Sequence, residues 1–91
     1  MEIREFYADH MRLSVGSYGV SLTFGLSEAH PAQGGLDAPA EEQARVRVSL
    51  EMAKMIAMML RHQLKSHERN GGRIAIPSSV FTQIGIAEED W

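Results

Sequence analysis

The chain has 91 residues, of which 44% are hydrophobic and 23% charged, a composition typical of one small globular domain and too apolar for a disordered protein. Its net charge of −3 gives no general attraction for nucleic-acid backbones or anionic lipid. Because cysteine is absent, disulfides, zinc-thiolate sites and cysteine nucleophiles are excluded.

The first part of the chain predicts a β-hairpin. Apolar and polar residues alternate from Met11 to Val15 and again from Tyr18 to Leu26, and residues 16–19 have the composition of a tight turn. We expect the first strand to begin near Phe6, with Asp9 at a bulge. One face of the hairpin should meet the core through Met11, Leu13, Val15, Tyr18, Val20, Leu22, Phe24 and Leu26.

A loop and a third strand should follow the hairpin. Residues 27–40 contain two prolines and a pair of glycines with little apolar content, which predicts a long mobile loop. Residues 43–48 then alternate Ala44, Val46 and Val48 with two arginines. This pattern predicts a short strand with Arg45 and Arg47 facing solvent.

A long amphipathic helix is predicted over residues 50–69. Ser49 suits the N-cap position, and Glu51 in the first turn complements the helix dipole. At 100° per residue one stripe of the helix should pack on the sheet, and this stripe consists of Ala53, Ile56, Ala57, Leu60 and Leu64. The apolar arc extends beyond that stripe through Met52, Met55 and Met59, and one thin sheet cannot cover an arc so wide.

The methionines make this flank the most informative feature of the sequence. Methionine is flexible and polarizable, and it serves both as core filler and on adaptable binding surfaces. Three interpretations of the flank stay open: a homo-oligomer interface, burial under the C-terminal segment, and a groove for a partner protein. A domain of this size buries only about 60% of its unfolded surface, which favours self-association.

The C-terminal region predicts a short extension of the sheet-and-helix unit. Residues 70–72 should end the long helix, and residues 73–76 read as a short strand or an extended edge segment. Pro77 suits the start of a short helix that reaches Ile84, and Gly85 suits its C-cap. The extension should cover a sheet edge or reach a neighbouring subunit. The predicted interface residues are Met52, Met55, Met59, Phe81, Ile84 and Trp91.

Three segments, residues 7–9, 18–25 and 44–49 leading into the methionine-rich helix, resemble a family of small bacterial and archaeal proteins known only as a domain of unknown function. The resemblance covers residues 5–69 and implies a strand-rich N-terminal half followed by one long helix. It implies no activity, ligand or catalytic residue. A shorter likeness over residues 72–90 is to swapped-hairpin antitoxin and transition-state regulators, which have a further strand beyond the acidic residue.

No set of residues predicts catalysis, a cofactor or a metal site. His62 and His67 are five positions apart and so point about 140° away from each other on one helix, and Asp9 and His10 project to opposite faces of a strand. No serine lies in a nucleophile elbow, and the glycine pairs lack a phosphate-binding pattern. The acidic runs 41–42 and 88–90 read as solvated charge.

Arginines on the outer sheet face are the only residues that favour nucleic-acid binding. Arg12, Arg45 and Arg47 could contact phosphates, but few aromatic residues are available for base stacking. An ordinary solvated face is the preferred interpretation. Nucleic acid is therefore not expected as a partner, and a second copy of the chain is the expected one.

The sequence thus predicts a single α+β domain over residues 1–91, with a core at 5–69 and an extension at 70–91. We expect three antiparallel strands packed against one long helix. The leading functional hypothesis is a non-enzymatic, homo-oligomeric interaction or structural subunit. Its alternatives are a small chaperone-like adaptor with a methionine groove and a DNA-binding antitoxin-type regulator. Without a long apolar segment, a cytoplasmic location with no membrane association is expected.

Overall fold

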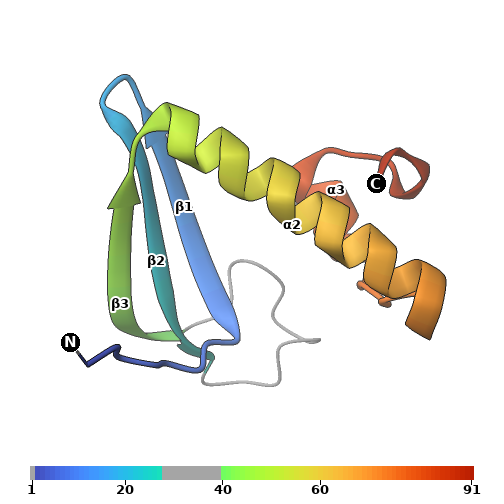
Figure 1. Cartoon of the computed structure of the whole chain (residues 1–91), viewed down its shortest axis with the longest axis horizontal. Coiled ribbons are helices and arrows are strands. Elements are labelled where there is room, and N and C mark those ends of the chain that lie inside the picture. The colour runs from blue at the N-terminus through green and yellow to red at the C-terminus, as the bar shows by residue number, and fades with distance from the viewer. Residues whose placement is uncertain (1, 28–39) are drawn as a thin grey trace.

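The fold is an antiparallel three-stranded sheet followed by one long helix and a short C-terminal arm (Figure 1). A computed structural model of the chain describes residues 2–27 and 40–91. The strands are β1 (His10–Gly16), β2 (Gly19–Ser27) and β3 (Ala40–Val48), in the spatial order β1-β2-β3. The helices are α2 (Leu50–Gly71), α3 (Ser78–Ile84) and the 3-10 helix η2 (Glu88–Asp90). The predicted α+β class and strand number are confirmed.

A two-residue turn joins β1 to β2 and fixes their register. Gly16 pairs with Gly19, so Ser17 and Tyr18 form the turn, as the composition predicted. Tyr18 is fully exposed, because a residue at the turn no longer belongs to either face of the sheet. The prediction that Tyr18 meets the core is therefore wrong.

The alternation of the three strands gathers their apolar residues on one face. Cross-strand neighbours on this face form rows of three residues. Val20, at the centre of the row nearest the turn, is buried, with 7% of its surface exposed, and the residues at the centres of the next rows are less covered. From the turn outward, the rows are Val15, Val20 and Val48; Leu13, Leu22 and Val46; and Met11, Phe24 and Ala44.

Two strand boundaries differ from the prediction. β1 begins at His10 and not near Phe6. Asp9, just before the strand, is hydrogen-bonded to β2: its amide donates to the Gly25 carbonyl at 3.1 Å, and its carboxylate accepts from the Ser27 amide at 2.7 Å. β3 begins at Ala40, three residues earlier than expected. A register shift opposite the Phe24–Gly25 step interrupts the alternation there, which hid the start of the strand. The loop predicted over 27–40 otherwise lies outside the described residues.

The predicted N-terminal features of the long helix, its N-cap and its acidic first turn, are confirmed. The Ser49 hydroxyl accepts a hydrogen bond from the Met52 amide at 3.1 Å, and Glu51 lies in the first turn. The helix runs two residues past the predicted end, to Gly71. Gly72 is its C-cap, with a positive φ of 96° and an amide that donates to the Glu68 carbonyl.

The C-terminal arm consists of α3, η2 and the segments around them. α3 begins after Pro77 and ends at Gly85 in the left-handed conformation, as predicted. Residues 73–76 form no strand, so the short-strand alternative is wrong: the Ile74 amide donates to the Glu68 carboxylate, and Arg73 pairs with Glu88. An isolated strand-like sequence without a partner strand has no ladder to join.

α2 meets the sheet only near its own start. It crosses the sheet close to the β1–β2 turn and then continues beyond the outer edge of β1, so that its second half and the arm project away from the strands (Figure 1). Of the stripe predicted to face the sheet, Ala53 and Ile56 are half-buried, whereas Leu60 and Leu64 are exposed. The radius of gyration is 14.5 Å, compared with about 12 Å for a compact domain of this length.

Candidate functional site

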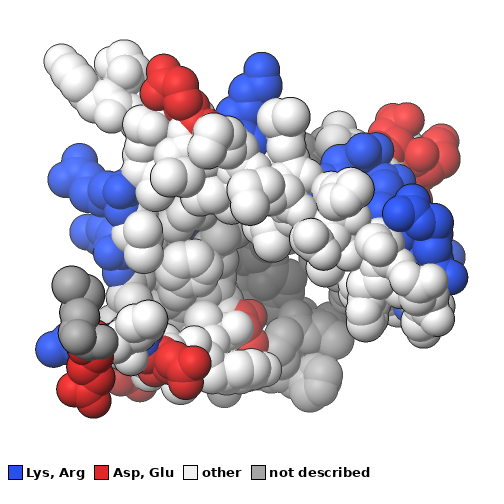
Figure 2. All heavy atoms as spheres, in the orientation of Figure 1, with Lys and Arg blue, Asp and Glu red and all other residues white. Residues whose placement is uncertain are grey.

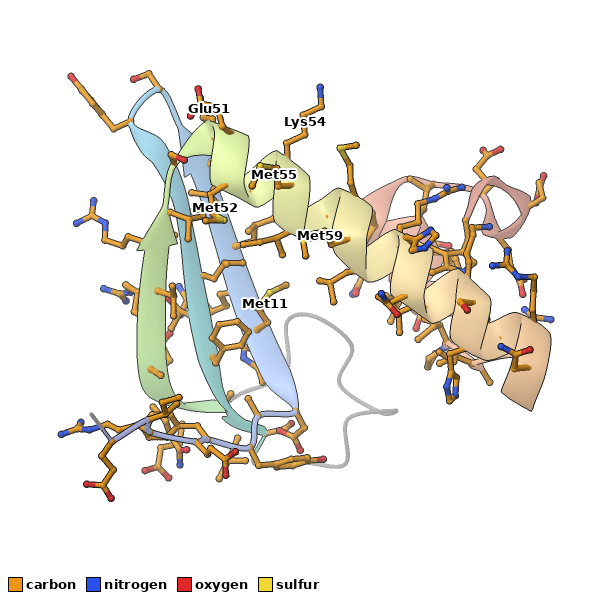
Figure 3. The ribbon with its side chains drawn as sticks, viewed as in Figure 1. Met11, Glu51, Met52, Lys54, Met55 and Met59 are labelled. Atoms are coloured by element: carbon orange, nitrogen blue, oxygen red, sulfur yellow. The ribbon has the colours of Figure 1, made fainter. Side chains whose placement is uncertain are left out.

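An uncovered apolar surface lines the inside of the angle between the sheet and α2. Met11 projects from β1 into this angle, and Met52, Met55 and Met59 follow α2 along it, while Lys54 points away from the sheet (Figure 3). The three helix methionines are 43%, 50% and 66% exposed. The C-terminal arm does not cover them, which rules out burial of this methionine flank under the arm.

Charged side chains avoid this surface. Figure 2 shows uncharged side chains across the centre of the view, over the sheet and the start of α2, with lysine, arginine and acidic residues gathered at the margins. Large exposed apolar patches with a polar rim mark interaction sites in soluble domains. We define the apolar angle as this surface, formed by Met11, Leu13, Val15, Val46, Met52, Met55, Met59 and Leu60.

A second apolar surface lies between the far half of α2 and the arm. A hollow of about 730 Å³ is open to solvent there. Its walls come from α2 through Leu64 and from the arm through Ile74, Phe81, Ile84 and Trp91. Of the predicted interface residues in the arm, Phe81 and Trp91 are half-buried in this hollow and Ile84 is exposed. The structure thus places the predicted interface residues on two surfaces of the chain.

The Glu68 carboxylate holds the arm against α2 by two hydrogen bonds, which we call the Glu68 clamp. One oxygen of its carboxylate accepts from the Trp91 indole N–H at 2.7 Å, and the other accepts from the Ile74 amide at 2.9 Å. Lys65 and Arg61 flank the indole ring, with their charged groups 5.5 and 6.0 Å from its centroid. The bond from Trp91, then that from Ile74 and the nearby cations, hold the pKa of Glu68 below its ordinary value. Sequence reasoning missed this clamp because nothing in local spacing relates residues 23 positions apart.

Acid is expected to release the arm. Since the pKa of Glu68 is lowered in the folded chain, its contribution is complete above the ordinary glutamate pKa of about 4.3 and is lost as the pH falls through the lowered value. Trp91 is the only tryptophan of the sequence, so its fluorescence reports on the arm. We expect a red shift of its emission on acidification. Glu68→Gln should show that red shift already at neutral pH and no transition in this range; an unchanged acid transition in the variant would contradict the clamp.

The outer face of the sheet carries ion pairs among its own residues. Arg12 and Arg45 both pair with Glu42, and the Arg45 side chain donates to the Thr23 hydroxyl at 2.9 Å. Thr23 is 8% exposed. Glu42, which the sequence indicated as solvated charge outside the predicted strand, lies in β3, where it partly neutralises the arginines that could otherwise contact phosphate. Glu88 of the second acidic run pairs with Arg73.

The described residues offer no further chemical centre. Within residues 2–27 and 40–91, no three His, Asp or Glu side chains converge so that they could hold a metal ion. None of the helices in these ranges has both the length and the hydrophobicity of a bilayer span. The chain has no significant match among protein-family models, curated proteins or solved structures. The two family resemblances over residues 5–69 and 72–90 therefore stay predictions.

Proposed function

We propose that this chain is a non-enzymatic structural or interaction subunit that works as a homo-oligomer, with the apolar angle as its interface. The observation that carries the proposal is the poor burial of apolar side chains in the single chain. Among the described residues, Val20 is the one large apolar side chain that is buried. A folded domain normally depends on many such side chains for its stability.

The surface area of the chain supports a partner of comparable size. Its accessible surface is 7671 Å², whereas a compact monomer of 10.1 kDa has about 5,300 Å². The excess of roughly 2,400 Å² is at the upper end of what each subunit buries in an obligate homodimer, and it is shared among the apolar angle, the hollow beside the arm and the exposed residues 2–7. Because the uncovered surface is apolar and almost uncharged, it matches a second copy of itself.

The stability of the chain is expected to depend on its concentration. If folding and association are coupled, each tenfold increase in chain concentration adds about 1.4 kcal/mol to the apparent free energy of unfolding per dimer. Urea unfolding at 1, 10 and 100 μM, followed by circular dichroism, should therefore show midpoints that rise with concentration. Light scattering in the micromolar range should give at least twice the mass of one chain. A single monomeric mass together with one unchanging midpoint would overturn the proposal.

A chaperone-like adaptor is the second candidate, and the exposed methionines favour it. A flexible methionine surface can adapt to several client sequences. In that case the purified chain stays monomeric and binds an unfolded apolar client, such as reduced α-lactalbumin, through the methionine flank. A subunit whose flank is already occupied by a second copy suppresses client aggregation poorly. Light scattering of the chain alone and with that client separates the two functions.

A further inference from the structure

The free edge of β1 is the part of the apolar angle that can join two copies through backbone hydrogen bonds. β1 lies at one edge of the sheet and pairs only with β2 among the described residues. An edge strand presents a row of unpaired amides and carbonyls. β1 contains neither proline nor lysine, two residues that commonly protect such edges, and among the described residues no segment other than β2 forms backbone hydrogen bonds with it.

The hairpin register determines which groups point outward from that edge. Gly16 and Gly19 flank a two-residue turn, so they form a hydrogen-bonded pair. Such pairs alternate along an antiparallel ladder, and the even-numbered residues of β1 therefore bond to β2. Met11, Leu13 and Val15 consequently direct their amides and carbonyls away from the sheet. Their side chains lie on the apolar face, where Leu13 is 57% and Val15 is 63% exposed.

We infer that two copies of the chain pair antiparallel through β1, about a two-fold axis at Leu13, to form one continuous six-stranded sheet. This inference rests on the proposed homo-oligomeric function and specifies its partner and contact. Leu13 then exchanges two backbone hydrogen bonds with Leu13 of the second copy, and Met11 of each copy does the same with Val15 of the other. The outward amides and carbonyls of all three residues are then hydrogen-bonded. The apolar faces of the two sheets form one continuous surface.

The side chains of β1 are compatible with such self-pairing. On the polar face Arg12 lies opposite Ser14 of the second copy, so no like charges face each other. The other free edge behaves differently. β3 directs the amides of Arg45 and Arg47 outward, and antiparallel self-pairing about Val46 would place an arginine opposite an arginine. Like charges directly opposite destabilise a strand pair, which favours β1 over β3 as the joining edge.

The position of α2 explains why this pairing also covers the apolar angle. α2 crosses its own sheet near the β1–β2 turn and extends past the free edge of β1 (Figure 1). In the joined sheet, the region beyond that edge is the apolar face of the second copy. The far half of each α2, with Leu60 and its neighbours, then lies over the other sheet. The two-fold axis sets the helices antiparallel and side by side, which places Met52, Met55 and Met59 between them.

Amide hydrogen exchange of the unmodified chain tests the pairing. At a concentration where light scattering shows the oligomer, the amides of Met11, Leu13 and Val15 should exchange at least tenfold more slowly than those of Arg45 and Arg47, which stay at an open edge. An oligomer in which the three β1 amides exchange as fast as the two β3 amides would overturn the β1 pairing and leave the proposed function standing. A monomeric mass would overturn both.

A cysteine placed on the axis gives a second, independent test. The chain contains no cysteine, so Leu13→Cys introduces a single thiol. Across the axis the two Cα atoms of a hydrogen-bonded pair lie about 5.5 Å apart, within reach of a disulfide. Mild oxidation should convert most of the Leu13→Cys variant into a disulfide-linked dimer that a reducing agent returns to single chains. The Arg45→Cys variant, with its thiol on the opposite edge, should not become crosslinked. Crosslinking of Arg45→Cys in place of Leu13→Cys would contradict the assignment of the edge.

Discussion

Met59→Glu is expected to dissociate the oligomer and to unfold the chain at low concentration. Met59 is 66% exposed in the single chain, so a glutamate there meets no conflict within one copy. In the proposed assembly the same position lies between two apolar helices, and an unpaired charge buried there costs about 3 kcal/mol or more. That corresponds to at least roughly a 100-fold weaker association. Sedimentation equilibrium across a concentration series measures this change.

Lys54→Gln is the matched control for this substitution. It changes the net charge by the same single unit and lies on the same helix, but Lys54 points away from the sheet (Figure 3). Its effect on association should stay within about 0.5 kcal/mol, as is usual for exposed positions. If Met59→Glu is as mild as Lys54→Gln, the methionine flank faces water in solution and the assembly has another interface. If Met59→Glu stays folded and monomeric but loses binding to an unfolded client, the adaptor function is favoured.

Gly25→Ala is expected to lower the free energy of unfolding by about 2 to 3 kcal/mol, which is a large part of the stability of so small a domain. Gly25 lies at the register shift between β2 and β3, where the two backbones approach closely. A Cβ at this position would overlap the backbone carbonyl of Glu41 and lie 3.1 Å from the Cα of Glu42. Since both obstacles belong to the backbone, the strand itself would have to move.

Gly16→Ala provides the comparison for Gly25→Ala. A Cβ at Gly16 meets no atom within 4 Å, and its φ is not positive. This variant should therefore differ from the unmodified chain by no more than about 0.5 kcal/mol in urea unfolding. Equal losses in the two variants would show that glycine flexibility, and not the close approach of β3, limits substitution in this sheet.

Local sequence signals placed most of the elements. Alternation assigned the apolar face of all three strands, and the caps at Ser49 and Gly85 set a start and an end of two helices. These signals are reliable because they depend on residues only a few positions apart in the chain. They did not decide between the two alternatives for residues 73–76, a short strand or an extended segment, because a strand requires a neighbouring strand and the alternation of four residues does not show whether one is present.

The candidate surfaces were only partly predictable. The methionine flank followed from helical spacing, and its exposure could be expected from the width of the apolar arc. The free edge of β1 could not, because the alternation that marks Leu13 as apolar is the same whether the strand is central or at an edge. The clamp of Glu68 on Trp91 was equally hidden, since it joins two residues that only the path of the arm brings together.

The sequence by itself therefore determined the class of the fold, the face on which its apolar residues gather and the excess of apolar surface on the helix, because all three follow from periodicity and composition. Only the tertiary structure decided that α2 leaves its own sheet, that β1 is an edge and that the arm closes on Glu68. Those features depend on the direction in which one element passes another. That direction is set by contacts between residues far apart in the chain, which no local pattern records.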